Sequence, residues 1–455
     1  MEQAFIDNTK KVKIPAVLTA AVLFIILLYC PIFDNPQAQK ALALLVMVAV
    51  LWMTEAIPLA LTGLLIPVVA SLLHLIPPGD AFHEFAHPII FLFMGGFVIA
   101  GALTQYGLDK QLAQKLISLA KGNFYKSAIL LMLATSLTAC WVSNTAATAM
   151  MIPLGLGLLR LSNNKGLTPE SKFLILGIAY AANIGGVITM VASPPNAIGA
   201  AILELSFTEW MLYSVPVFLL TFPVMVLLLT LYFKPDRKMS IGEMVVTKQQ
   251  GTPNKMLIAI FLITIILWVL DGVLSPLLQL AGSFSSLVAV LAIFLLFITK
   301  VMHWKHILKS IQWDVLLLFG GGLTLGMLVD HSGLGIILVG GVAKFITIVP
   351  LFVFLWIIVL FSIVLTEFMS NTASAALILP LLFTMANQLH VNPMILVFPA
   401  TIAASYGFML PAGTPPNAMA YASGLVPQKD MMKIGLVLNI VFSILLTTFF
   451  YFIFK

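Results

Sequence analysis

The chain has 455 residues, of which 61% are hydrophobic and 9% are charged, and its mean hydropathy is +1.09. This composition excludes a soluble globular domain and indicates a polytopic membrane protein. The net charge of +6 does not indicate a nucleic-acid partner, because the basic residues cluster between apolar runs, where they report membrane topology.

About eleven apolar runs are suited to a spanning helix, which needs roughly 20 mostly apolar residues in a lipid bilayer. Alternating segments of about ten residues, the pattern of membrane β-barrels, are absent. The sequence therefore predicts an all-α polytopic membrane protein with about eleven transmembrane helices. These runs begin near Ile14, Lys40, Leu59, Pro88, Lys172, Trp210, Met256, Ser283, Trp313, Asn392 and Met431.

The distribution of basic residues predicts the orientation. If the N-terminus is cytoplasmic and the spans alternate, all 23 Lys and Arg residues fall inside except Lys40, Lys344 and Lys455. This is the positive-inside rule, and it predicts a cytoplasmic N-terminus and a periplasmic C-terminus. Residues 1–36 are interpreted as the first transmembrane helix. The absence of Asn-x-Ser/Thr sequons favours a bacterial inner membrane.

A short loop after the third predicted span carries Asp80, His83, Glu84 and His87. This group suggests a metal site, but its spacing lacks the pairing of known zinc motifs. A solvated loop is the preferred interpretation.

The chain contains two related halves. A Gly-Gly pair, a Ser-Asn-Thr triplet and a Pro-Pro-Asn segment occur in this order in the first half and again in the second. The halves are predicted at 37–233 and 256–455, joined by a cytoplasmic linker at 234–255. On the predicted topology they have opposite orientation, and such inverted repeats are typical of secondary transporters. The matched blocks are 95–96 and 321–322, 143–145 and 370–372, and 194–196 and 415–417.

Each triplet is predicted to form the tip of a hairpin, at about 127–159 and about 351–389. About 15 residues flank the first triplet on each side, which gives about 22 Å of helix, too short to cross a bilayer. A polar tip inside the membrane is tolerated only within protein or beside a wet cavity. The Pro-Pro-Asn segments are predicted to break helices at about 172–203 and about 392–424, because proline removes a backbone donor.

The repeated motifs supply groups for an anion and for a cation. Hydroxyl and amide donors beside helix N-termini suit a carboxylate, whereas Asn, Ser and backbone oxygens suit sodium. Between Lys344 and Lys429 the only charged residue is Glu367, so a dianion there would need co-bound cations. Two similar loops facing each other suit a ligand with two similar ends, such as succinate. The alternative is that small residues merely allow close helix packing.

These motifs, together with Thr54–Pro58, Thr366-Glu367 and the Gly-Thr-Pro-Pro-Asn sequence at 413–417, make the chain resemble the divalent anion/sodium symporter family. This family comprises the bacterial relatives of the INDY and sodium-dicarboxylate carriers. The resemblance implies a homodimer with scaffold and transport domains, an elevator-type mechanism and Na⁺ as the co-transported ion.

The resemblance also implies the site residues. Ala139 departs from the family pattern, because some sodium-coupled relatives have a hydroxyl there; a backbone carbonyl would take its place. The substrate contacts are Ser143, Asn144, Thr145, Ser370, Asn371, Thr372, Thr414 and Pro415. The first sodium site comprises Ser143, Asn144, Ala139, Ala192, Ser193 and Asn196. The second comprises Thr366, Met369, Ser370, Asn371, Gly413 and Asn417.

The sequence thus predicts sodium-coupled uptake of C4 dicarboxylates such as succinate, malate and fumarate. The first alternative is a sodium-independent exchanger of dicarboxylates or tricarboxylates on the same fold. The neutral residues after each triplet, beginning at Ala146 and Ala373, favour sodium coupling, because some exchangers of the family carry a cationic side chain there. A channel or a membrane-embedded enzyme is a remote alternative, and the chain shows no catalytic motif.

Overall fold

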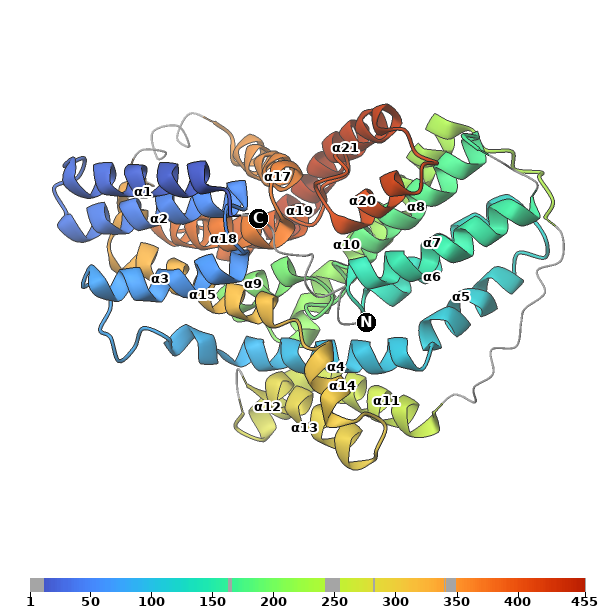
Figure 1. The fold of residues 1–455 in the computed structure, drawn as a ribbon, viewed down its shortest axis with the longest axis horizontal. Coiled ribbons are helices and arrows are strands. Elements are labelled where there is room, and N and C mark those ends of the chain that lie inside the picture. The colour runs from blue at the N-terminus through green and yellow to red at the C-terminus, as the bar shows by residue number, and fades with distance from the viewer. Residues whose placement is uncertain are drawn as a thin grey trace.

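The computed structural model describes residues 12–162, 166–241, 254–280, 283–338, 340 and 349–454. Within these ranges the chain folds into helices joined by loops, with no β-strand beyond one isolated bridge (Figure 1). The first-half helices are α1 (Ile14–Tyr29), α2 (Pro36–Thr54), α3 (Leu59–Leu72), the 3₁₀ helix η2 (His83–Ala86), α4 (Pro88–Gln105), α5 (Leu108–Ser118), α6 (Phe124–Ala139), α7 (Asn144–Leu161), α8 (Pro169–Gly185), α9 (Pro194–Ile202) and α10 (Phe207–Phe233).

The second half follows the predicted linker, of which residues 242–253 lie outside the described ranges. Lys344 and Lys455, used above for the topology, also lie outside them. The helices of this half are α11 (Lys255–Val269), α12 (Asp271–Leu277), α13 (Phe284–Ile298), α14 (Trp304–Ser310), α15 (Trp313–His331), α17 (Leu351–Phe368), α18 (Asn371–Gln388), α19 (Pro393–Ala403), α20 (Pro415–Ala422) and α21 (Gln428–Phe454).

Six helices of the described ranges have the length and composition to cross a membrane, namely α2, α4, α10, α15, α17 and α21. The pair α11 and α12, bent by 72°, makes a seventh if it forms one span. Each of the eleven expected starting points lies within four residues of a helix start. The predicted all-α polytopic fold is therefore confirmed, although α1, α3, α8, α13 and α19 are shorter than a full span.

The two halves pack as repeats. Helix α3 packs on α15, and the repeat-related helices α13 and α4 pack on each other in the same way. Small residues allow both contacts. A Cβ on Gly321 would overlap the backbone of Gly63, and a Cβ on Gly95 would lie 2.6 Å from that of Ala289. Equivalent positions thus meet in both contacts, since Gly63 corresponds to Ala289 and Gly95 to Gly321.

Both triplets lie at hairpin tips. In Figure 1, α6 and α7 extend to the right of the centre and α18 extends to the left, so the two hairpins approach the middle from opposite ends. Helix α9 packs against α18, and α20 packs against α7. Each half therefore completes the hairpin of the other. The arm α17 has the length and composition of a span, but it ends at the same kind of tip.

The prolines play a different role from the one expected. The helix breaks lie at 186–193 and 404–414, before the Pro-Pro pairs, and the prolines occupy the first positions of α9 and α20. Proline is tolerated there because the first helical N–H has no intrahelical partner. The Pro-Pro pairs therefore start the second helix of each broken pair and do not interrupt the first.

Candidate functional site

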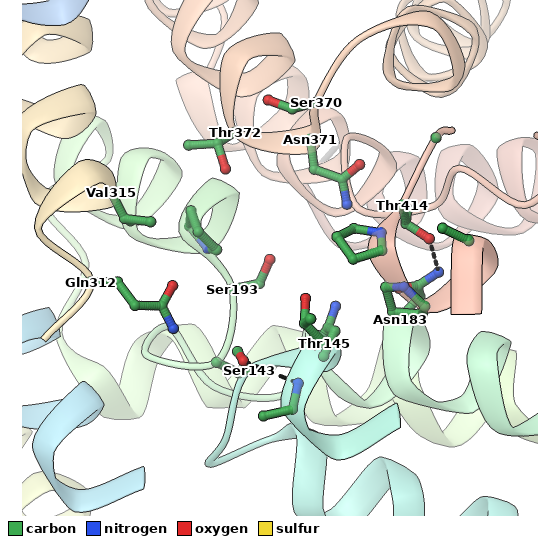
Figure 2. Close-up of a pocket in the computed structure, with 18 of the residues that line it drawn as sticks. Ser143, Thr145, Asn183, Ser193, Gln312, Val315, Ser370, Asn371, Thr372 and Thr414 are labelled. Carbon is green, nitrogen blue, oxygen red and sulfur yellow. Dashed lines mark hydrogen bonds between the residues drawn. The ribbon is translucent and has the colours of Figure 1, made fainter. Parts of the chain in front are cut away.

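Both hairpin tips and both helix breaks meet at one cavity of about 840 Å³ (Figure 2). All eight residues expected to contact the substrate line it. Figure 2 shows residues of the two tips on opposite sides of the space, with Asn371 above and Thr145 below. The lining residues are Glu55, Ser143, Asn144, Thr145, Ala146, Ala149, Asn183, Ala192, Ser193, Pro194, Gln312, Val315, Ser370, Asn371, Thr372, Pro411, Ala412, Gly413, Thr414, Pro415, Pro416 and Ala418.

The serine of each triplet caps the second arm of its hairpin. Ser143 Oγ accepts a hydrogen bond from Ala146 N at 3.3 Å, and Ser370 Oγ accepts one from Ala373 N at 3.2 Å. The first amides of α7 and α18 have no intrahelical partner, and the helix dipole adds partial positive charge at the same place. The N-termini of α7 and α18 can therefore donate hydrogen bonds to anionic groups.

The Pro-Pro-Asn segments hold the helix breaks in place. Asn196 Nδ2 donates to Gly186 O and Thr189 O, both at 2.8 Å. At the equivalent place, Asn417 Nδ2 donates to Gly407 O at 2.8 Å and to Leu410 O at 3.1 Å. Sequence reasoning assigned both asparagines to sodium, and the structure gives their NH₂ groups this additional structural role. Their carbonyl oxygens are thereby fixed in direction.

In the first half, three buried asparagine carbonyl oxygens lack a donor in the described part of the chain, those of Asn144, Asn183 and Asn196. Two of them, Asn144 Oδ1 and Asn196 Oδ1, belong to expected sodium ligands. Buried acceptors of this kind are costly unless a donor or a cation satisfies them. The amide of Asn144 lies against Gly186, because a Cβ on that glycine would overlap it. Ala139, where some sodium-coupled relatives have a hydroxyl, packs with Ala147 and Ala182.

In the second half, three oxygens crowd together. Thr366 Oγ1 lies 2.6 Å from Asn371 Oδ1 and 2.8 Å from Ala404 O. A hydroxyl has one proton and can donate it to only one of these acceptors. One of the two short contacts is therefore between oxygens without a shared proton, and a cation bound between them would offset their repulsion. The carbonyl of Ala404 is a member of this group that sequence reasoning missed, because any residue type supplies a backbone oxygen.

Glu367, the one acid near the second triplet, is an anchor for the second helix break. Its carboxylate accepts hydrogen bonds from Met409 N at 2.8 Å, Leu410 N at 2.9 Å and Asn439 Nδ2 at 2.8 Å. It is buried and does not line the cavity. Glu367 thus connects α17, the 404–414 loop and α21.

The cavity wall carries little charge. Glu55 is the charged residue among those that line it, and no Lys or Arg is among them. The expected sodium ligands Ala192, Ser193 and Gly413 reach the wall, whereas Ala139, Asn196, Thr366, Met369 and Asn417 lie behind it. Sequence reasoning missed Asn183 and Gln312 as lining residues. The signal for Asn183 was an amide within the apolar run that starts near Lys172.

Comparison with known proteins identifies the class. The family described as "Citrate transporter" matches residues 49–401. An uncharacterized transporter of Haemophilus influenzae is 39% identical over 434 residues, covering 94% of each chain. The sodium-dependent dicarboxylate transporter SdcS of Staphylococcus saprophyticus is 33% identical over 493 residues, covering 99% of this chain and 94% of its own.

A solved structure has the same general fold. The YdaH transporter of Alcanivorax borkumensis, described as having an unusual topology, matches with a TM-score of 0.58 over 95% of this chain and 98% of its own. The sequence identity is 15%, so this likeness concerns the fold alone.

Proposed function

Because this chain belongs to the citrate transporter family, we propose that it is a secondary active transporter that carries C4 dicarboxylates into the cell together with sodium. The supporting observation is one cavity onto which the N-termini of α7 and α18 open, together with the unpartnered oxygens of Asn144 and Asn196 and the crowded oxygens of Thr366, Asn371 and Ala404 at and behind its wall. Succinate, malate and fumarate are the proposed substrates.

The two donor sites suit a ligand with a carboxylate at each end. The N-termini of α7 and α18 come from opposite halves and open onto the same cavity. The second helices of the broken pairs begin with prolines, which have no N–H to offer. The donors for a dianion are therefore the triplets with the hydroxyls of Ser193 and Thr414.

Sodium would supply the positive charge that the cavity lining lacks. A dianion beside a wall with no Lys or Arg and with one Glu is unfavourable unless cations bind with it. The oxygens around Asn144 and Asn196 form the proposed first sodium site, and those around Thr366, Asn371 and Ala404 form the second. More than two sodium ions per dianion would move net positive charge inward, worth about 2.3 kcal/mol per charge per 100 mV.

The proposal includes three further properties, which the resemblance of the chain to the symporter family implies. These are an inner-membrane homodimer, a cytoplasmic N-terminus and an elevator-type movement. The helices around the cavity (α6–α10 and α17–α21) would form the transport domain, and α2–α4 with α11–α15 the scaffold. Labelling of single cysteines from either side, combined with cross-linking, tests the orientation and the dimer.

Uptake by purified protein in proteoliposomes tests the function. The vesicles contain no dicarboxylate, and radiolabelled succinate is added outside with an inward sodium gradient. Choline replaces sodium in the control. We expect succinate to accumulate only with sodium, and an inside-negative potential to increase the uptake if the stoichiometry exceeds two.

A sodium-independent exchanger would give a different result. Uptake would then be independent of sodium and would occur only after the vesicles are loaded with a dicarboxylate or tricarboxylate. That outcome would refute both proposed sodium sites.

A further inference from the structure

A side chain in the wall of the cavity connects the two halves directly. Asn183 of α8, in the first half, is fully buried and donates from Nδ2 to Thr414 Oγ1 at 3.1 Å (Figure 2). Thr414 is the N-cap residue of α20 in the second half and lines the cavity. Neither the repeat motifs nor the sodium groups described above include Asn183.

The direction of the Asn183 amide is fixed by its neighbours. Asn417 Nδ2 is held by the carbonyls of Gly407 and Leu410, so Asn417 Oδ1 must point the other way. That oxygen lies 3.4 Å from Asn183 Nδ2. Since Asn417 Oδ1 can only accept, the NH₂ group of Asn183 and not its carbonyl faces Thr414.

The Thr414 hydroxyl consequently has both its acceptor positions occupied. It accepts from Asn183 Nδ2 and, at 3.3 Å, from Asn417 N. A hydroxyl has two lone pairs and one proton, and in the described ranges this proton has no acceptor. Because Thr414 lines the cavity, the group left to receive the proton is the bound anion.

We propose that Asn183 is a positioning residue of the substrate site, which commits the Thr414 hydroxyl to donate to a carboxylate oxygen of the transported anion. This inference rests on the proposed function. Ser193, which corresponds to Thr414 in the first half, has no equivalent of this bond. The position that corresponds to Asn183 is Ala404, which has no side-chain donor, and the side chain of Ser193 makes no capping bond. One carboxylate of the substrate therefore meets a preset donor and the other meets a hydroxyl that can rotate.

The test measures succinate uptake in proteoliposomes at saturating sodium. Asn183→Leu removes the donor at similar volume, and Asn183→Asp offers Thr414 an acceptor that competes with the substrate. We expect each to raise KM for succinate by about tenfold, the effect of one hydrogen bond. Vmax should stay within about twofold, and the half-saturating sodium concentration should not change. If Asn183→Leu fails to insert, the isosteric Asp variant carries the test.

Tyr180→Phe is the matched control. Tyr180 lies one turn earlier on α8, and its hydroxyl donates to Phe408 O at 2.6 Å, so it makes a similar bond between halves that does not involve Thr414. We expect Tyr180→Phe to keep the wild-type KM. An equal rise in KM for this variant would show that loss of any contact between the halves suffices, and would overturn the positioning role.

A double-mutant cycle isolates the bond. Thr414→Val alone should raise KM, and Asn183→Leu should add nothing to it, since both variants remove the same donation. Additive effects, an unchanged KM for Asn183→Leu, or a shift in sodium affinity alone would each overturn the inference. A wild-type protein that transports no dicarboxylate would overturn the proposed function as well.

Discussion

Thr366 Oγ1 lies 2.6 Å from Asn371 Oδ1, and the same hydroxyl lies 2.8 Å from Ala404 O. We predict that Thr366→Val raises the half-saturating sodium concentration for uptake by about tenfold, because it removes one ligand of the proposed second sodium site. Succinate KM at saturating sodium should change little. Thr264→Val is the control, since that buried hydroxyl donates to Ile260 O of its own helix.

The two triplet asparagines should both be essential. Asn144→Ala and Asn371→Ala each remove an amide at the cavity wall, and we expect each to reduce uptake by at least about a hundredfold, since substrate and sodium contacts are lost together. Both proteins should insert and elute from size-exclusion chromatography like the wild type. Near-normal uptake by both would refute the site assignment.

Glu367 should matter for the shape of the second helix break. In Glu367→Gln, an NH₂ group would replace one oxygen that now accepts from Met409 N or Leu410 N. A donor facing a donor should destabilise the loop by about 1–3 kcal/mol. Thermal unfolding in detergent measures the loss. The control is Cys140→Ser at the repeat-related position, which should unfold within a few degrees of the wild type.

The close contact between α3 and α15, which joins the two halves, should not tolerate an added methyl group. Gly321→Ala would overlap the backbone of Gly63, and backbone cannot move aside like a flexible side chain. We expect a loss of about 1–3 kcal/mol in stability. Gly157→Ala is the control, because nothing lies within 4 Å of its Cβ position; it should be neutral or stabilising by up to about 1 kcal/mol. Equal stability of the two variants would refute the close packing.

The N-terminus of α4 should respond to acid. Burial lowers the pKa of His87, against the opposing effect of the Glu84 and Glu204 carboxylates. The neutral imidazole accepts from Ile89 N at 3.3 Å. As the pH falls below the unfolded pKa of about 6.5, the unfolded chain binds a proton before the folded one does, so stability decreases. His87→Asn should flatten this decrease in Tm between about pH 7.5 and 5. His83→Asn should not, and both should transport normally at pH 7.5.

Much of the architecture was predictable because it follows from length and repetition. The short runs on either side of Ser143–Thr145 could not cross a bilayer, and α6 indeed ends at Ala139, just before that triplet, while α7 begins within it at Asn144. The repeated Pro-Pro-Asn segments located both broken helices. The true break positions were missed, because prolines are as compatible with a helix start as with an interruption.

The interior of the site was only partly predictable. Periodicity does not reveal that Asn417 uses its NH₂ group on loop carbonyls, nor that Asn183 reaches Thr414 from the other half. These contacts depend on side-chain directions and on helices distant in sequence. Backbone ligands such as Ala404 O cannot be predicted from the residue type, because every residue has a backbone carbonyl.

The exchange of partners between the halves has a consequence for biosynthesis. Helix α7 is made long before α20, and α9 long before α18, although each packs on the other. A nascent chain that ends at the linker therefore presents the first hairpin tip, with its asparagine and hydroxyls, to lipid or to an insertion chaperone. Completion of the polar core must wait for the last quarter of translation, and a chain truncated before then should be a substrate for membrane quality-control proteases.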